Sequence, residues 1–399
     1  MKKIIIFSVL ILNFNLLFSQ EHDFKIELLT KLFNSEKKDI AELFDLSFKE
    51  KVSIDKTYDI LNSYKRSLGK QTNVIIEADS YNIIFEKGAI QSKIYLNDNN
   101  KIIGLWFGPI ILFNLTIDSI LSEFKKIPGN NSLSIFKNNN SSILSYNEDE
   151  PLAVGSSFKL LILKLIYKKI TDKKINWNDI IILKKNNKSI QSGILQDWPD
   201  NTPLTLKTLA ALMISISDNT AADILIDYLG REEIEKNVSE INKPFLKTKD
   251  FFILKFSSDI NIYSEYMKSK IQEKRKILET FNNKDISDVK INSKPTNIDK
   301  IEWFFSTKDL CNLIYGLKDS DEIKINLGAF INKKDWYIAG YKGGYEPGVL
   351  QYTFILEKNK GDNIYTISAT VNNKNNAVDN NKINELMMNI ISQIKENKI

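Results

Sequence analysis

The sequence predicts two units behind a short leader: a small α+β unit of helices followed by strands, and a larger α/β unit in which helices pack on an antiparallel sheet. Three observations predict this. The apolar period changes from helical to two after residue 69, a long apolar run begins near residue 156, and three late strands precede a final helix. A length of 399 residues suits about two domains. We expect the leader at 1–19, the first domain at 20–109 and the second at 110–399.

The first residues have the pattern of a secretory signal peptide. Lys2 and Lys3 form a positive end, residues 4–12 form an apolar centre, and Ser19 precedes a plausible cleavage point. The apolar run is interrupted by Asn13 and is too short to span a bilayer comfortably. We therefore expect an exported protein, periplasmic or secreted, with no stable membrane span after cleavage. An uncleaved anchor is the alternative.

The first unit begins with three helical stretches, at 24–33, 40–48 and 54–68, and Gly69 ends the third. Four runs with a period of two then predict strands at 74–78, 81–85, 90–96 and 102–107. Helices followed by a curved meander predict an α+β cone, similar to the small folds of ketosteroid isomerases and nuclear transport factors. We assign no catalytic residue to this unit. A packing or dimerisation module is the expectation, and a ligand pocket is the alternative.

The second unit has strands at both ends of a helical block. A helix is predicted at 115–126, and strands at 132–136 and 142–146 join through a turn at 138–140. After the helical block, three strands and a closing helix are expected at 336–342, 348–356, 365–371 and 379–395. This order predicts an antiparallel sheet packed with helices.

Composition excludes several classes of function. The net charge is +5 and the lysines are scattered, without a basic stripe of interleaved aromatics, so we expect no nucleic-acid binding. The chain has one His, His22, and one Cys, Cys311. A Ser-His-Asp triad, a Cys-His pair and a His-rich metal site are therefore excluded, and no metal or cofactor is expected. Any proton transfer must use lysine, carboxylates or tyrosine.

The long apolar run carries a serine and a lysine at helical spacing. Ser156 lies at its start after Gly155, where a small polar residue can cap the first turn, and Lys159 follows three residues later. Burial of a lysine lowers its pKa and favours the free amine. A free amine beside a hydroxyl is a base beside a nucleophile. A serine cap followed by a lysine whose head reaches water is the alternative for this pair alone.

Three short motifs occur in order along the chain: Ser156-x-x-Lys159, Ser217-Asp218-Asn219 and Lys342-Gly343-Gly344. In this order and over the last two-thirds of the chain, the sequence resembles the superfamily of class A β-lactamases and penicillin-binding proteins, with Gly343 in place of threonine. A ketosteroid-isomerase-like unit ahead of such a domain resembles a protein of the clavulanic acid pathway. Taken alone, Ser217-Asp218-Asn219 could be a helix cap, and Gly343-Gly344 could be a hairpin or bulge.

The resemblance implies a role for each motif residue. Ser156 is the nucleophile and Lys159 its base partner. Ser217 relays a proton to the leaving group, and Asn219 binds the substrate or Lys159, whereas Asp218 turns the backbone. Lys342 adds a second positive charge that lowers the pKa of Lys159 and attracts a substrate carboxylate. Gly343, Gly344 and Tyr345 are the other expected substrate contacts. The Tyr345 amide forms an oxyanion hole with the Ser156 amide.

One part of the family pattern is missing. The glutamate that activates water in class A β-lactamases usually stands in Glu-x-x-Leu-Asn, and residues 231–256 lack this pattern. Glu240 and Asp250 are the nearby carboxylates. We expect an exported serine hydrolase that acts on a small-molecule substrate, a β-lactam or a related amide or ester, and so a link to β-lactam breakdown and antibiotic resistance. A D-alanyl-D-alanine peptidase acting on cell-wall peptide, an esterase, or a non-catalytic ligand-binding protein are the alternatives.

Overall fold

The computed structural model describes residues 21–399 except 78–79, 140, 285, 288 and 329, and the leader predicted at 1–19 lies outside them. Two compact units divide the chain: the described residues up to Ser122 together with Asn381–Glu396, and Glu123–Asn380 together with Asn397–Ile399. The division falls within α5 (Ile117–Lys125). The domain boundary expected at residue 110 stays a prediction. Over the described residues, every helix is too short or too polar to cross a membrane.

The first unit has a helical layer on a four-stranded antiparallel sheet. A helix at 21–34 precedes α2 (Lys37–Leu43), α3 (Leu46–Lys49) and α4 (Ile54–Leu68). The strands follow in the order β1 (Gln71–Glu77), β2 (Ser80–Phe85), β3 (Gly88–Leu96) and β4 (Ile102–Leu112). Side chains from both layers, among them Leu29, Phe33, Leu61, Ile83 and Phe85, form one apolar core. Closure of this sheet into a cone stays a prediction.

The helix predicted at 40–48 is wrong as a single element. The chain leaves α2 at Phe44, which pairs with Ile102 of β4, and Asp45 begins α3 by accepting a hydrogen bond from the Ser47 amide at 2.9 Å. An aspartate that can cap a new turn competes with continuation of the old one. Buried Phe44 contributes its ring to the core at this break.

The last helix, α14 (Asn380–Lys395), is grouped with the first unit. The Asn389 side chain accepts from the Leu112 amide at 2.8 Å and donates to the Ile110 carbonyl at 3.0 Å. Lys395 forms an ion pair with Glu77 at 2.9 Å. These contacts satisfy backbone groups at the end of β4 that its partner strand leaves unpaired.

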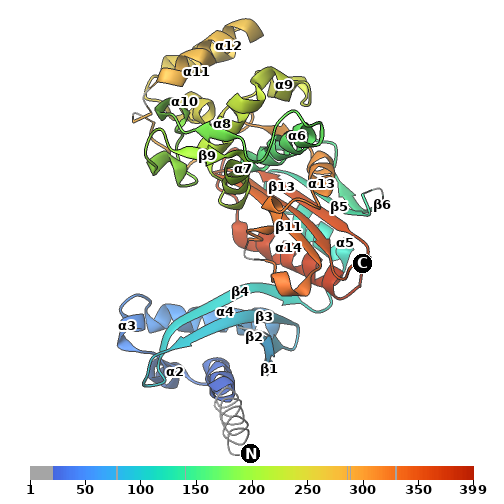
Figure 1. Cartoon of the computed structure of the whole chain (residues 1–399). Helices are drawn as coiled ribbons and strands as arrows, with labels where there is room; N and C mark the ends of the chain where they lie inside the picture. Colours follow the sequence, from blue (N-terminus) through green and yellow to red (C-terminus); the bar gives the residue numbers. More distant parts are fainter. Residues whose placement is uncertain (1–20, 78–79, 140, 285, 288, 329) are drawn as a thin grey trace, which may run out of the picture. The chain divides into compact units, whose positions relative to one another are not determined.

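The second unit contains a five-stranded antiparallel sheet, in the order β11-β12-β13-β5-β6 (Figure 1). Its strands are β5 (Asn130–Lys137), β6 (Ser141–Tyr146), β11 (Ile338–Glu346), β12 (Val349–Glu357) and β13 (Tyr365–Asn372). Two small antiparallel pairs join β7 (Leu152–Ala153) to β10 (Phe304–Phe305) and β8 (Ile180–Ile182) to β9 (Pro203–Thr205). Early and late strands thus meet where β5 pairs with β13, and the predicted antiparallel sheet with helices is confirmed.

The helical block lies between the early and late strands. Its α-helices are α6 (Lys159–Thr171), α7 (Leu206–Ser215), α8 (Asn219–Leu229), α9 (Arg231–Glu235), α10 (Thr248–Phe256), α11 (Ile260–Lys268), α12 (Ile271–Thr280) and α13 (Thr307–Tyr315). Its short 3₁₀ turns are η1 (Gly155–Phe158), η2 (Lys185–Asn187), η3 (Leu195–Asp197), η4 (Glu240–Asn242), η5 (Phe281–Asn283), η6 (Glu322–Lys324) and η7 (Lys333–Asp335).

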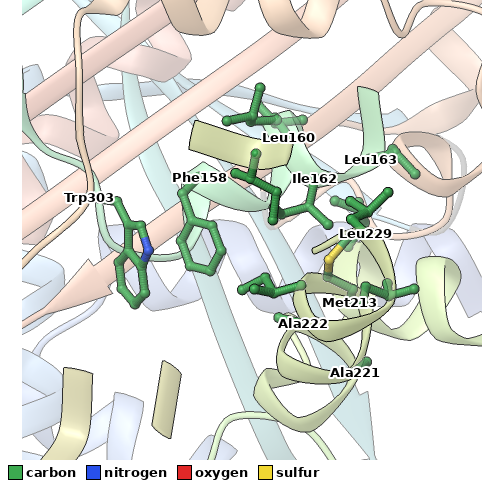
Figure 2. Packing of buried hydrophobic residues seen from close by; sticks show 14 of the residues in the cluster. Phe158, Leu160, Ile162, Leu163, Met213, Ala221, Ala222, Leu229 and Trp303 are labelled. Atoms are coloured by element: carbon green, nitrogen blue, oxygen red, sulfur yellow. The ribbon is translucent and has the colours of Figure 1, made fainter. Parts of the chain in front are cut away.

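Helix α6 lies at the centre of this block. Its residues from Leu160 to Leu163 are buried, as are Leu165 and Ile166. Figure 2 shows α6 side chains packed near Met213 of α7 and Leu229 of α8, with Trp303 beside Phe158. The Phe158 and Trp303 rings stack with centroids 4.0 Å apart. A helix buried on nearly all sides fixes the position of the residues at its N-terminus.

Candidate active site

The first predicted motif lies where a 3₁₀ turn becomes a helix. Ser156 is in η1, and Lys159 is the first residue of α6. Ser156 is half-buried, whereas the side chain of Lys159 is fully buried. The predicted serine cap is wrong, because Val154 occupies the cap position and no side chain bonds the first turn. The serine hydroxyl is therefore not committed to holding the helix end.

The second motif forms the tight turn before α8. Ser217 has a φ of 57°, in the left-handed region that is costly for a residue with a side chain. The next residue, Asp218, caps α8 by accepting from the Ala221 amide at 2.8 Å. Its other oxygen accepts from the amides of Ile194 and Leu195 at 2.8 and 3.0 Å. Asp218 thus fixes the backbone of the turn, and the side chains of Ser217 and Asn219 on either side of it can make other contacts.

The amine of Lys159 joins the first two motifs. It donates to the Ser217 carbonyl at 2.6 Å, the Ser217 hydroxyl at 3.2 Å and the Asn219 side-chain oxygen at 2.7 Å. In the part of the chain that the structure describes, no hydrogen bond joins this amine to the Ser156 hydroxyl. An ammonium has three donors, and these three contacts use all of them. Loss of one proton would free a lone pair for a further partner.

Lys342, on β11, approaches the same serine from the other side. Its amine is 3.1 Å from the Ser217 hydroxyl and 2.5 Å from the Gly343 carbonyl oxygen. The Ser217 hydroxyl therefore lies between two lysine amines. This arrangement can pass a proton from one amine to the other through the hydroxyl.

Both amines are easy to deprotonate. Burial lowers the pKa of Lys159 well below its usual value, and the charge of Lys342 lowers it further, while Asp218 and Asp223 act in the opposite direction. Burial lowers the pKa of Lys342 to about 7. A buried charge loses its hydration, and two positive charges in one site repel each other. Near neutral pH the site can therefore hold a free amine that acts as a base.

The third motif brings backbone amides next to the Ser156 turn. A Cβ atom on Gly344 would lie 1.9 Å from the Val154 carbonyl oxygen and 2.9 Å from the Ser156 nitrogen. A Cβ atom on Gly155, whose φ is 49°, would lie 3.2 Å from the Tyr345 nitrogen. Only glycines permit so close an approach of these two backbone segments. The Ser156 and Tyr345 amides therefore lie close together, as an oxyanion hole requires.

A threonine side chain at position 343 would collide with Tyr341. A Cβ atom at this position would lie 2.1 Å from the hydroxyl oxygen of Tyr341, which is on the same strand. The space that a threonine side chain would take is occupied by the tyrosine. Recognition of a substrate carboxylate through a hydroxyl at position 343 is thus not available.

A cavity of about 230 Å³ opens beside the Ser156 turn. It is lined by Gly155, Ser156, Phe158, Gln191, Ser192, Asn219, Thr248, Phe251, Phe252, Phe256, Ile291, Glu302, Trp303, Tyr345, Glu346 and Pro347. Ser156, Asn219 and Tyr345 were predicted at the site, and Lys159, Ser217 and Lys342 connect to them through the hydrogen bonds above. Six aromatic rings form much of the wall, so the cavity suits a substrate with an apolar group.

The aromatic wall and two carboxylates, Glu302 and Glu346, are cavity features that the three motifs do not indicate. The run Phe251-Phe252-Ile253-Leu254-Lys255-Phe256 carried a weak signal, because a short helix with aromatics on several sides must bury them. Glu346 directly follows Tyr345 and could have been included with the third motif. The position of Glu302 had no local signal. Glu240, whose side chain is 89% exposed, and buried Asp250 do not line the cavity.

Part of the chain is similar in sequence to known proteins. Residues 115–259 match the β-lactamase enzyme family model. A β-lactamase of Bacillus subtilis (strain 168) is 30% identical over 119 residues, which are 30% of this chain and 36% of that protein. A Moraxella catarrhalis β-lactamase is 29% identical over 92 residues, 23% of this chain and 29% of that protein. These matches thus span about a third of each relative's length.

Among solved structures, a β-lactamase from Sphaerobacter thermophilus DSM 20745 aligns over 72% of this chain and 99% of its own, at 16% identity and a TM-score of 0.48. The matched family segment includes Ser156, Lys159, Ser217 and Asn219 but ends before Lys342. Residues 115–259 are thus similar to the β-lactamase enzyme family, as the first two motifs predict. The ketosteroid-isomerase-like first unit stays a prediction.

Proposed function

We propose that the protein is an exported serine hydrolase of the class A β-lactamase superfamily. In this proposal, Ser156 attacks a β-lactam or a related amide or ester and forms an acyl-enzyme. One observation carries the proposal: two buried lysine amines flank the Ser217 hydroxyl beside the cavity that Ser156 lines. So arranged, the amines supply a base without histidine.

Acylation begins when a neutral Lys159 takes the proton of the Ser156 hydroxyl. The Ser156 oxygen forms a bond to the carbonyl carbon, and the amides of Ser156 and Tyr345 stabilise the resulting oxyanion. The carbon–nitrogen bond then breaks. Ser217 gives its proton to the leaving nitrogen and is reprotonated by a lysine beside it. The Ser217 hydroxyl contacts both lysine amines, so either amine can return a proton to it.

A peptidase or esterase that uses the same site is the second candidate. The absence of the Glu-x-x-Leu-Asn pattern favours it. Aligning Leu246 with the leucine of Glu-x-x-Leu-Asn puts Lys243 in the place of the glutamate and Lys247 in that of the asparagine. Lys243 pairs with Glu240 at 2.6 Å, and Lys247 donates to Asn282 at 2.6 Å. A lysine of opposite charge, Lys243, thus stands in the place of the usual water-activating glutamate.

The experiment is a substrate panel of a chromogenic cephalosporin, a penicillin, a D-alanyl-D-alanine peptide and a p-nitrophenyl ester. Wild-type protein is compared with Ser156→Ala, and product release is followed from the first milliseconds. The proposal expects turnover of at least one member that is abolished in Ser156→Ala. Equal activity in the two proteins would contradict Ser156 as the nucleophile. No activity against the whole panel would contradict the proposal and favour a non-catalytic binding protein. The order of rates across the panel selects between a β-lactamase and a peptidase or esterase.

A further inference from the structure

Five of the rings that line the Ser156 cavity form an aromatic row in successive contact: Phe158, Trp303, Phe251, Phe252 and Phe256. The Trp303 ring stacks on Phe158 (Figure 2) with centroids 4.0 Å apart and on Phe251 with centroids 5.0 Å apart. Phe251 meets Phe252 edge to face at 5.1 Å, and the ring centroids of Phe252 and Phe256 are 6.3 Å apart. The row therefore presents one continuous apolar surface to the cavity.

The aromatic row is anchored in the core and leaves apolar surface uncovered in the cavity. The indole nitrogen of Trp303 donates to the Leu246 carbonyl at 3.1 Å, which fixes the ring at the middle of the row. Phe252 is only half-buried, and two other lining residues, Ile291 and Tyr345, are 49% and 60% exposed. A bound apolar group would cover these three side chains and gain the free energy of their burial.

The volume of the cavity suits a single aryl group. A dry apolar cavity of about 150 Å³ binds one benzene molecule, and the cavity beside Ser156 measures about 230 Å³. Phe158, in the aromatic row, is two residues from Ser156, and both line the cavity. An acyl group with a ring on a short linker therefore fits beside the serine.

The lining offers no cation to a charged substrate. Among the described residues that line the cavity, none is a lysine or arginine, and two, Glu302 and Glu346, carry carboxyl groups. The fully buried Lys255 is not part of the lining: its amine is 2.6 Å from a Glu346 oxygen and 4.3 Å from the centre of the Phe251 ring. A substrate carboxylate in this cavity would lose its water without gaining a counter-ion.

Lys342, to which the family resemblance gives a substrate carboxylate, is committed to other groups. Its amine is bonded to the Ser217 hydroxyl and the Gly343 carbonyl, and its side chain is almost completely buried. Burial lowers the pKa of Lys342 to about 7, so the amine does not keep a full charge at neutral pH. Tyr341 fills the space of a hydroxyl at position 343. A carboxylate beside Lys342 would thus lack both a full positive charge and a second donor.

We propose that the preferred substrates of Ser156 are esters or amides whose acyl group carries an aryl ring and which have no carboxylate beside the reacting bond. The proposal rests on the function proposed above and names the substrate class of the same site. The ring lies against the aromatic row and covers Phe252, Ile291 and Tyr345. The neutral polar side chains of the lining, Gln191, Ser192 and Asn219, suit an uncharged ester or amide.

Two pairs of substrates test this specificity. p-Nitrophenyl phenylacetate and p-nitrophenyl acetate share a leaving group and differ in the ring, and benzylpenicillin and its methyl ester share an acyl group and differ in charge. After division by the rates of hydrolysis in buffer, kcat/KM for the phenylacetate should exceed that for the acetate about 10- to 100-fold, the factor expected for burying a phenyl group. The methyl ester should acylate the protein at least as fast as benzylpenicillin, as measured by stopped-flow mixing and intact mass.

Phe252→Ala removes the half-buried ring of the row, and Phe113→Ala is the matched control. Phe113 follows β4, is exposed and does not line the cavity. We expect the preference for the phenylacetate over the acetate to fall at least about threefold in Phe252→Ala, because the substrate ring loses part of its apolar contact. In Phe113→Ala the preference should equal that of the wild type. The preference is a ratio of two rates on one protein, so partial loss of folded protein cancels from it.

Failure of this inference differs from failure of the function on which it rests. A preference for the phenylacetate below about threefold, with activity abolished in Ser156→Ala, overturns the aryl specificity and leaves Ser156 as the nucleophile. Acylation by benzylpenicillin more than about threefold faster than by its methyl ester shows a bound carboxylate and also overturns the inference. A wild-type preference in Phe252→Ala overturns the place given to the ring. Ester hydrolysis that persists in Ser156→Ala overturns the proposed function and this inference together.

Discussion

Replacing Lys342 by methionine should stabilise the protein while it impairs acylation. The Lys342 side chain is almost completely buried, and burial lowers its pKa from 10.5 to about 7. Between these values the unfolded chain holds a proton that the folded chain has lost, so stability rises with pH from about 7 to 10.5. Below pH 7 the folded protein bears the full cost of the buried charge. Methionine has a similar length and carries no charge.

The size of the effect follows from the two pKa values. Each pH unit between them is worth about 1.4 kcal/mol. Because the folded protein has lost half of this proton at pH 7, the buried amine costs about 4 kcal/mol at pH 7 and about 2 kcal/mol at pH 9. Loss of the hydrogen bonds to Ser217 and Gly343 subtracts about 1 kcal/mol each. The net gain for Lys342→Met is therefore about 2 kcal/mol at pH 7 and about zero at pH 9.

Urea unfolding at the two pH values measures this difference. The change of about 2 kcal/mol between pH 7 and pH 9 depends on the titration alone and not on how well methionine packs. Exposed Lys360, between β12 and β13, provides the control: Lys360→Met should change the free energy of unfolding by less than about 0.5 kcal/mol at both values. A stability change for Lys342→Met that is the same at pH 7 and pH 9 would refute a titrating, buried amine at this position.

Three further predictions concern acylation. Lys159→Ala should fold and acylate about 10²- to 10⁴-fold more slowly, because the serine loses its base; stopped-flow acylation checks this, and a wild-type rate would mean that another group takes the proton. Ser217→Ala should slow acylation by a β-lactam far more than acylation by a p-nitrophenyl ester, because only the amine leaving group needs a proton. Equal slowing with both substrates would contradict the relay. Gly344→Ala should displace β11, since its Cβ would lie 1.9 Å from the Val154 carbonyl oxygen, and reduce acylation by at least about tenfold. Unchanged acylation would argue against the oxyanion hole.

Elements with a clear period were predicted well, and their ends less so. The strand predicted at 102–107 continues to Leu112 as β4, because α14, far away in sequence, satisfies the backbone groups at its end. The helix predicted at 40–48 breaks at Asp45, whose capping bond competes with helix continuation. In both cases a specific polar contact overrides the apolar pattern.

The site was predictable where its residues lie in short motifs. Ser156, Lys159, Ser217, Asn219 and Lys342 come from three segments, yet their contacts meet at one hydroxyl and one cavity. The partners of Lys159 were not predictable in detail, because they depend on the left-handed turn at Ser217.

Glu302 illustrates the limit of the motifs. It reaches the Gly155 amide only because β7 pairs with β10, which brings together residues 147 positions apart. Neither Glu302 nor its neighbours Trp303 and Phe304 form a pattern that indicates a cavity wall. Contacts of this kind follow from the tertiary fold and not from local spacing.

Mapping an acyl adduct to its residue tests the central claim most directly. The protein is incubated with a fluorescent penicillin, quenched at several times and digested, and the labelled peptide is sequenced by mass spectrometry. The account predicts one label, on Ser156. The neighbouring Ser157 is fully buried and bonded to Gln351, and Ser217 is bonded to both lysines, so neither should react. A label on Ser157 or Ser217, with Ser156 unmodified, would contradict the assignment of the nucleophile.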